Sequence, residues 1–118
     1  MPSIDVFKHD PKLERVEAGT TVFSQGDAAD FMYVVVEGEI ELRLPHVILE
    51  VAGPGSVFGE MAIVDASPRS GTAIARTPAQ IVPIDRRRFL YLIENTPYFA
   101  IEVMRTLSRR LRVLDAAR

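Results

Sequence analysis

A glutamate and an arginine lie nine positions apart in the glycine-rich segment 53–73. The planar guanidinium of Arg69 can hold two phosphate oxygens at once, and Pro68 stiffens the loop before it. Glu60 would repel a phosphate unless the same ligand also offered hydroxyl donors, as a ribose does. Gly59 allows a tight turn, and residues 59–63 can form one helical turn with free N–H groups. The segment therefore predicts a small anion site.

Each of these residues also has an ordinary interpretation. Glu60 would be favourable as an acid in the first turn of a helix, and Arg69 would be unremarkable as a solvated loop charge. Two other phosphate motifs fit poorly. Gly53, Gly55 and Gly59 are spaced one residue too widely for a dinucleotide fingerprint, and no Lys-Ser or Lys-Thr pair follows to make a P-loop.

The runs 58–63 (FGEMAI) and 68–73 (PRSGTA) resemble the phosphate-binding cassette of the cyclic nucleotide-binding domain family. The resemblance implies that Arg69 pairs with a cyclic phosphate and that Glu60 accepts a hydrogen bond from the ribose 2′-hydroxyl. Backbone N–H groups near Ala62 and Ser70 would complete the cradle. The ligand-binding residues implied are Phe58, Gly59, Glu60, Met61, Ala62, Pro68, Arg69, Ser70 and Thr72.

Three further features bear on this resemblance. Gly71 stands where the family more often has alanine, and we expect it to loosen the start of the strand without removing a ligand contact. Ser70 is typical of relatives that use cAMP, so we expect both cAMP and cGMP to bind, with cAMP favoured. Leu111, Leu114 and Asp115 are candidate lid or base contacts. Leu114 and Asp115 replace hydroxyl residues that contact adenine in relatives, which leaves the mode of base recognition open.

Composition bounds the class of protein. The 118 residues fit a single domain, and 47% hydrophobic with 25% charged residues is typical of a soluble globular protein. There is no cysteine, and the two histidines are isolated, so we predict no metal, no cofactor and no thiol chemistry. Ser56 does not lie in a nucleophile elbow, and we predict no catalytic residue. The lack of a signal peptide or an apolar run of membrane-spanning length predicts a cytoplasmic protein without membrane contact.

The elements that would position the site fall into two groups. After a short helical opening at residues 4–9, seven or so short strands with regular turn signals lie between about 12 and 84, as in the alternating run 39–44. No crossover helix separates them. This pattern predicts a mainly β fold with α elements: an antiparallel β-roll or jelly roll with a short cassette helix.

Two helices are predicted at the C-terminal end, at about 86–94 and 97–116. Three arginines in the first turn of the earlier helix oppose its dipole, so helix stability does not explain them. The later helix carries a near-heptad stripe formed by Ala100, Met104, Leu107, Leu111 and Leu114. This stripe predicts either packing on the β-roll or a homodimer through the helix.

These patterns together predict a cyclic nucleotide-binding regulatory module, not an enzyme, that signals to an unidentified effector protein by repositioning its C-terminal helices. One alternative is a protein-interaction module that has lost its ligand, and another is the sensor half of a longer transcription factor. Residues 86–118 hold eight arginines against three acids. They lack a second recognition helix, and the sequence ends where the family's transcription factors begin their helix-turn-helix. We therefore expect no direct DNA binding by these residues.

Overall fold

The computed structural model describes residues 6–116. The chain forms two four-stranded antiparallel sheets, which we together call the β-roll. The first sheet has the order β1 (Glu14–Val16), β8 (Ala79–Ile84), β3 (Met32–Glu37) and β6 (Val57–Phe58). The second has the order β2 (Thr21–Phe23), β7 (Thr72–Ala75), β4 (Ile40–Leu44) and β5 (Val47–Ala52). The predicted antiparallel β fold is confirmed, although β6 was not predicted as a strand.

Strand β3 is buried on both faces. Val35 belongs to a core cluster that draws residues from both sheets, whereas Val34 and Val36 belong to a second cluster shared with the helices. Successive side chains of a strand point to opposite faces, so a strand covered on both sides needs apolar residues at successive positions. This requirement explains why residues 32–36 form an unbroken apolar run.

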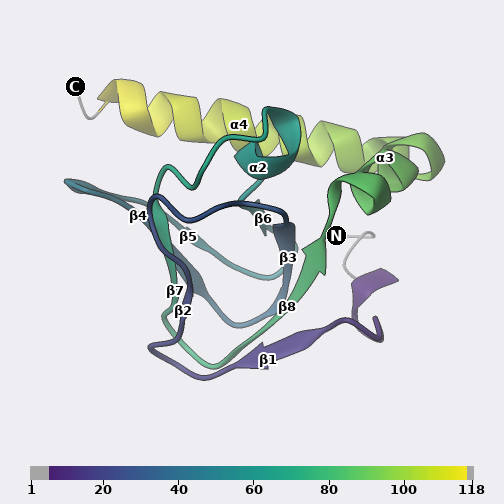
Figure 1. Cartoon of the computed structure of the whole chain (residues 1–118), viewed down its shortest axis with the longest axis horizontal. Helices are drawn as coiled ribbons and strands as arrows, with labels where there is room; N and C mark the ends of the chain where they lie inside the picture. The colour runs from purple at the N-terminus through teal and green to yellow at the C-terminus, as the bar shows by residue number, and fades with distance from the viewer. Residues whose placement is uncertain (1–5, 117–118) are drawn as a thin grey trace.

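After the helical opening turn, three helices lie in the described part of the chain: α2 (Met61–Val64), α3 (Arg86–Asn95) and α4 (Pro97–Ala116). Asp85 caps α3 by accepting a hydrogen bond from the Arg88 backbone N–H at 2.8 Å. Helix α4 lies across one end of the β-roll, with α2 beside it (Figure 1). Both C-terminal helices agree with their predicted ranges to within one residue. No helix among residues 6–116 combines the length and apolar character needed to cross a membrane.

The opening turn covers one end of the core. Phe7 is helical and buried, and its ring lies 6.5 Å from that of Phe99 on α4. This agrees with the predicted helical opening, of which residues 4 and 5 lie outside the described part of the chain.

The buried face of α4 lies one position away from the predicted stripe. Its buried residues are Phe99, Val103, Thr106 and Arg110, spaced by four, three and four. Met104 and Leu111 of the predicted stripe are instead 55% and 63% exposed. Arg110 therefore occupies a position on the helix that would ordinarily hold an apolar residue.

Candidate ligand-binding site

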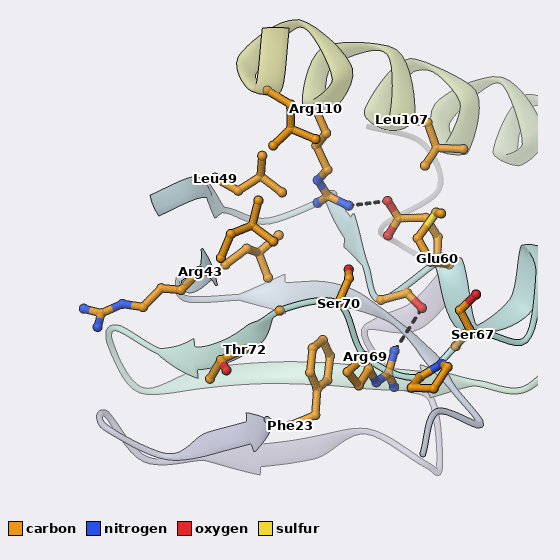
Figure 2. A pocket seen from close by; sticks show the side chains of 18 of the residues that line it. Phe23, Arg43, Leu49, Glu60, Ser67, Arg69, Ser70, Thr72, Leu107 and Arg110 are labelled. Carbon is orange, nitrogen blue, oxygen red and sulfur yellow. Dashed lines mark hydrogen bonds and ion pairs between the residues drawn. The ribbon is translucent and has the colours of Figure 1, made fainter. Parts of the chain in front are cut away.

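A cavity of about 220 Å³ lies between the second sheet, the cassette around α2, and α4 (Figure 2). Its wall includes the polar groups of Glu60, Arg69, Ser70 and Arg110. The rest is largely apolar, with leucines from β4, β5 and α4: Leu42, Leu44, Leu49, Leu107, Leu111 and Leu114. A small concave site with a few polar groups on an apolar lining is typical of small-molecule binding.

Arg69 is a buried cation that forms no ion pair within the described part of the chain. Its side chain donates to the carbonyl oxygens of Gly59 at 3.1 Å and Phe31 at 2.6 Å, and its guanidinium carbon lies 3.9 Å from the centre of the Phe23 ring. Its Nε has no hydrogen-bond partner, and no carboxylate forms an ion pair with it, among the described residues. Burial lowers the pKa of Arg69, but an arginine stays protonated. The arrangement leaves a positive charge that an anion entering the cavity would neutralise.

Gly59 is needed because the Arg69 side chain packs directly against its backbone. Its φ is +75°, which favours glycine, and a Cβ there would lie 2.7 Å from Arg69 Nη1. Any larger residue would therefore displace the guanidinium. The glycine and the arginine of the predicted motif are required as a pair.

Glu60 forms a buried ion pair with Arg110 of α4 (Figure 2). Glu60 is 2% exposed, and Arg110 Nη1 donates to its Oε1. Arg110 Nη2 donates to the Val57 carbonyl oxygen at 2.7 Å and to Glu50 Oε2 at 3.1 Å. Within residues 6–116 the second carboxylate oxygen of Glu60 has no hydrogen-bond partner, and it can accept from a ligand hydroxyl.

Glu50 of β5 connects two consecutive arginines of α4 to the β-roll. Arg109 donates to both of its carboxylate oxygens, at 3.1 and 3.3 Å, in addition to the contact with Arg110. Burial by itself would raise the pKa of Glu50, but the hydrogen bonds and charges of the two arginines outweigh burial and lower it. Glu50 is therefore held as a carboxylate, and it fixes α4 over the cavity.

The structure brings most of the predicted ligand-binding residues together. Gly59, Glu60, Met61, Ala62, Pro68, Arg69, Ser70 and Thr72 all line the cavity. Phe58 does not line it: this residue is fully buried in the core, where its ring stacks on Tyr33 at 5.1 Å. Leu111 and Leu114 line the cavity, whereas Asp115 does not.

Arg110 and Glu50 were not among the predicted site residues. They lie 50 and 10 residues from Glu60 in the sequence, and neither belongs to a local motif. One signal for Arg110 was present, because it continues the four-three-four spacing of Phe99, Val103 and Thr106. A charge at a core position of an amphipathic helix indicates a buried partner.

Gly71 has a stronger role than the sequence suggested. A Cβ at this position would lie 2.4 Å from the Arg43 carbonyl oxygen in β4. The pairing of β4 with β5 shifts register between Leu42 and Arg43, so the bulge and the glycine occur next to each other. Gly71 therefore allows close approach of two strands beside the cavity rather than merely loosening the strand start.

The antiparallel roll, the cassette and the covering helix are the parts of a known class of ligand-binding domain, and a comparison with protein families identifies it. The model of the family described as "Cyclic nucleotide-binding domain" matches residues 13–96, and the chain belongs to this family. No group of histidines and acidic residues that could hold a metal ion occurs within residues 6–116.

Particular relatives are regulatory proteins. The chain is 34% identical over 102 residues to the cyclic AMP receptor protein of Thermus thermophilus, covering 82% of this chain and 47% of that protein. It is 34% identical over 76 residues to the cAMP-dependent protein kinase regulatory subunit of Yarrowia lipolytica, covering 64% of this chain and 20% of the relative. The crystal structure of the Thermus thermophilus catabolite activator protein matches with a TM-score of 0.77 and 30% identity, covering 99% of this chain and 58% of that one. The chain thus spans less than half the length of these two curated relatives.

Proposed function

We propose that this chain is a sensor module that binds one cyclic nucleotide in the cavity and signals through α3 and α4. The observation that carries the proposal is Arg69, whose buried guanidinium has carbonyl and aromatic partners but no ion-paired carboxylate among residues 6–116. A phosphate supplies the missing charge and can accept from two guanidinium nitrogens at once. Membership of the cyclic nucleotide-binding domain family supports this choice of anion.

Glu60 and the leucine lining favour a nucleoside phosphate over a simple anion. The negative charge of Glu60 would repel any phosphate in the cavity if it were not neutralised. Arg110 neutralises it by forming the buried ion pair. The free oxygen of Glu60 then accepts from a ribose hydroxyl, which inorganic phosphate lacks. The leucines offer an apolar surface on which a flat base can pack.

We propose that cAMP binds more tightly than cGMP. Guanine carries more polar edge groups than adenine, and burying them against leucine without hydrogen-bond partners costs free energy. Two of the relatives described above have cyclic AMP in their names, which supports the same preference for cAMP. The modest polarity of the lining predicts a preference rather than exclusion of cGMP.

Calorimetric titration with cAMP, cGMP and 5′-AMP tests the proposal. We expect saturable binding of one cAMP per chain, weaker binding of cGMP, and much weaker binding of 5′-AMP, which cannot present a cyclic phosphodiester. Absence of both heat and a melting shift with any cyclic nucleotide would favour the alternative of a ligand-free interaction module. A tenfold preference for cGMP, about 1.4 kcal/mol, would overturn the base assignment alone.

We also propose that the exposed side of α4 pairs with a second copy of the chain. The exposed apolar residues of this helix include Tyr98, Ile101, Met104 and Leu111. Their spacings of three, three and seven residues place them along one side of α4. A stripe of this kind is rarely left in water by a monomer, and a twofold pairing would bury it against itself.

A further inference from the structure

The three arginines that open α3 differ in their tertiary partners. Arg86 Nη1 donates to the Ile63 carbonyl oxygen at 2.7 Å, across 23 residues of sequence. Arg88 pairs with Asp10, whereas Arg87 is exposed and has no hydrogen-bond or ion-pair partner among the described residues. A cation in the first turn opposes the helix dipole, so the sequence of α3 is locally unfavourable. The contact of Arg86 with the cassette offers a reason for its presence.

The carbonyl that Arg86 contacts belongs to the last turn of α2. Carbonyl groups at the end of a helix have no partner within the helix, and a charge-assisted bond satisfies this one strongly. The side chain of Ile63 is also buried, in a core cluster that contains Leu92 of α3 and Phe99 of α4. Ile63 therefore connects the cassette to α3 through its backbone, and its side chain shares a core cluster with residues of both helices.

The two ends of α2 are held by arginines from different helices. Glu60, immediately before α2, pairs with Arg110 of α4, and Ile63, near its end, accepts from Arg86 of α3. Since α2 has only four residues, it cannot shift without changing at least one of these contacts. The cassette and the two C-terminal helices are thus linked at two separate points.

We propose that Arg86 is a positioning residue that holds the end of the cassette helix and makes α3 follow the cassette when a ligand binds. The second half of this inference rests on the proposed function. A phosphate on Arg69 acts on the segment around Gly59, because Arg69 donates to the Gly59 carbonyl oxygen. Any resulting movement of α2 is transmitted to α3 through Ile63 and Arg86.

Hydrogen exchange of the ligand-free protein tests the positioning role without any nucleotide. Arg86→Ala should speed amide exchange in residues 61–66 by about tenfold, as expected for losing one charge-assisted hydrogen bond. Arg87→Ala is the matched control and should leave this exchange unchanged. Arg86→Lys should restore much of the protection, because it keeps a charged donor. Equal exchange in the Arg86→Ala and Arg87→Ala proteins would overturn the proposal.

Addition of cAMP then tests transmission. In the unchanged protein and in Arg87→Ala, we expect nucleotide to alter exchange in both the cassette and residues 86–95. In Arg86→Ala we expect the cassette response to persist and the response of α3 to fall by at least about half. An undiminished α3 response in Arg86→Ala would overturn transmission. If calorimetry shows that the unchanged protein does not bind a cyclic nucleotide, the proposed function and the transmission role both fail. The hydrogen-exchange comparison of the ligand-free proteins still decides whether Arg86 is a positioning residue.

Discussion

Arg110 and Glu60 form a buried ion pair that joins α4 to the cassette. The pair lies in the wall of the cavity, so the residue predicted to receive a ribose hydroxyl is also the residue that anchors the covering helix. Arg110 is shared with Glu50 of β5, which extends the network to the edge of the second sheet. In the proposed binding mode, ligand recognition and the position of α4 therefore depend on the same charges.

Removing Arg110 should strongly destabilise the protein. Arg110→Ala leaves Glu60 buried without its partner, and truncating one member of a buried ion pair typically costs about 3–5 kcal/mol. Arg109→Ala is the matched control, because Arg109 also contacts Glu50 but lies largely in solvent, and it should cost less than about 1 kcal/mol. Urea unfolding of the ligand-free proteins measures both. Similar losses in the two variants would contradict the importance of the buried pair.

Removing Arg69 should damage ligand affinity far more than folding. Arg69→Ala should weaken cyclic nucleotide binding by about 2–5 kcal/mol, as expected when one partner of a desolvated charge pair is truncated. The ligand-free fold should survive, since no described carboxylate forms an ion pair with Arg69 and would lose its partner. Calorimetry measures the affinity for the nucleotide, and far-UV circular dichroism shows whether the fold is retained. Unchanged affinity in the variant would remove Arg69 from the phosphate site.

The proposed role of Glu60 in binding the ribose hydroxyl can be separated from its contribution to folding stability by changing the ligand. For the unchanged protein, 2′-deoxy-cAMP should bind about 1.5–3 kcal/mol more weakly than cAMP, the range for a hydrogen bond to a charged group. In Glu60→Gln the difference between the two ligands should shrink. Because each comparison uses one protein and two ligands, a general loss of stability cancels. An equally large difference in both proteins would place the ribose hydroxyl elsewhere.

The stability of the protein should fall as the pH drops through the acidic range. The pKa of Glu50 is lowered by Arg109 and Arg110 against the effect of burial, and that of Asp10 is lowered by Arg88 against the same effect. Carboxyl groups with a lowered folded pKa stabilise the fold above their unfolded values, about 4.5 and 3.8, and lose this contribution as the pH falls through the folded pKa. Unfolding free energies measured from pH 7 to pH 3 should show this decline.

Two variants assign the acid sensitivity. Glu50→Gln and Asp10→Asn should each be less stable at pH 7 and should show a flatter decline with acid than the unchanged protein. Glu94→Gln, which alters an exposed carboxyl group on α3, should keep the original slope. An unaltered slope in both Glu50→Gln and Asp10→Asn would show that other groups control the acid transition.

The exposed stripe of α4 should support self-association. Light scattering should give the mass of two chains, either in the free protein or with cAMP, and Met104→Asp should reduce it to one chain with little effect on ligand affinity. Met104 is the better site for this test, because Leu111 lines the cavity as well as being exposed. A monomer mass in both states at high protein concentration would remove the dimer, and the exposed stripe would then need another partner.

The sequence by itself determined the cassette and the class of fold. Gly59, Glu60 and Arg69 lie within eleven residues, so the conformation that joins them is local and glycine and proline reveal it. The alternating strands and the capped helices likewise follow from short-range periodicity. Asp85 and Pro97 mark the starts of α3 and α4 for the same reason.

Only the tertiary structure decided which residues complete the site. Arg110 faces the cavity because of how α4 is rotated about its own axis. The observed buried face differs from the predicted stripe by one position along the helix. The partners of Arg86 and Glu50 come from other elements, and the need for a glycine at position 71 arises from the path of β4. These contacts join segments far apart in the chain, and their geometry is set by the packing of whole elements, which no local pattern encodes.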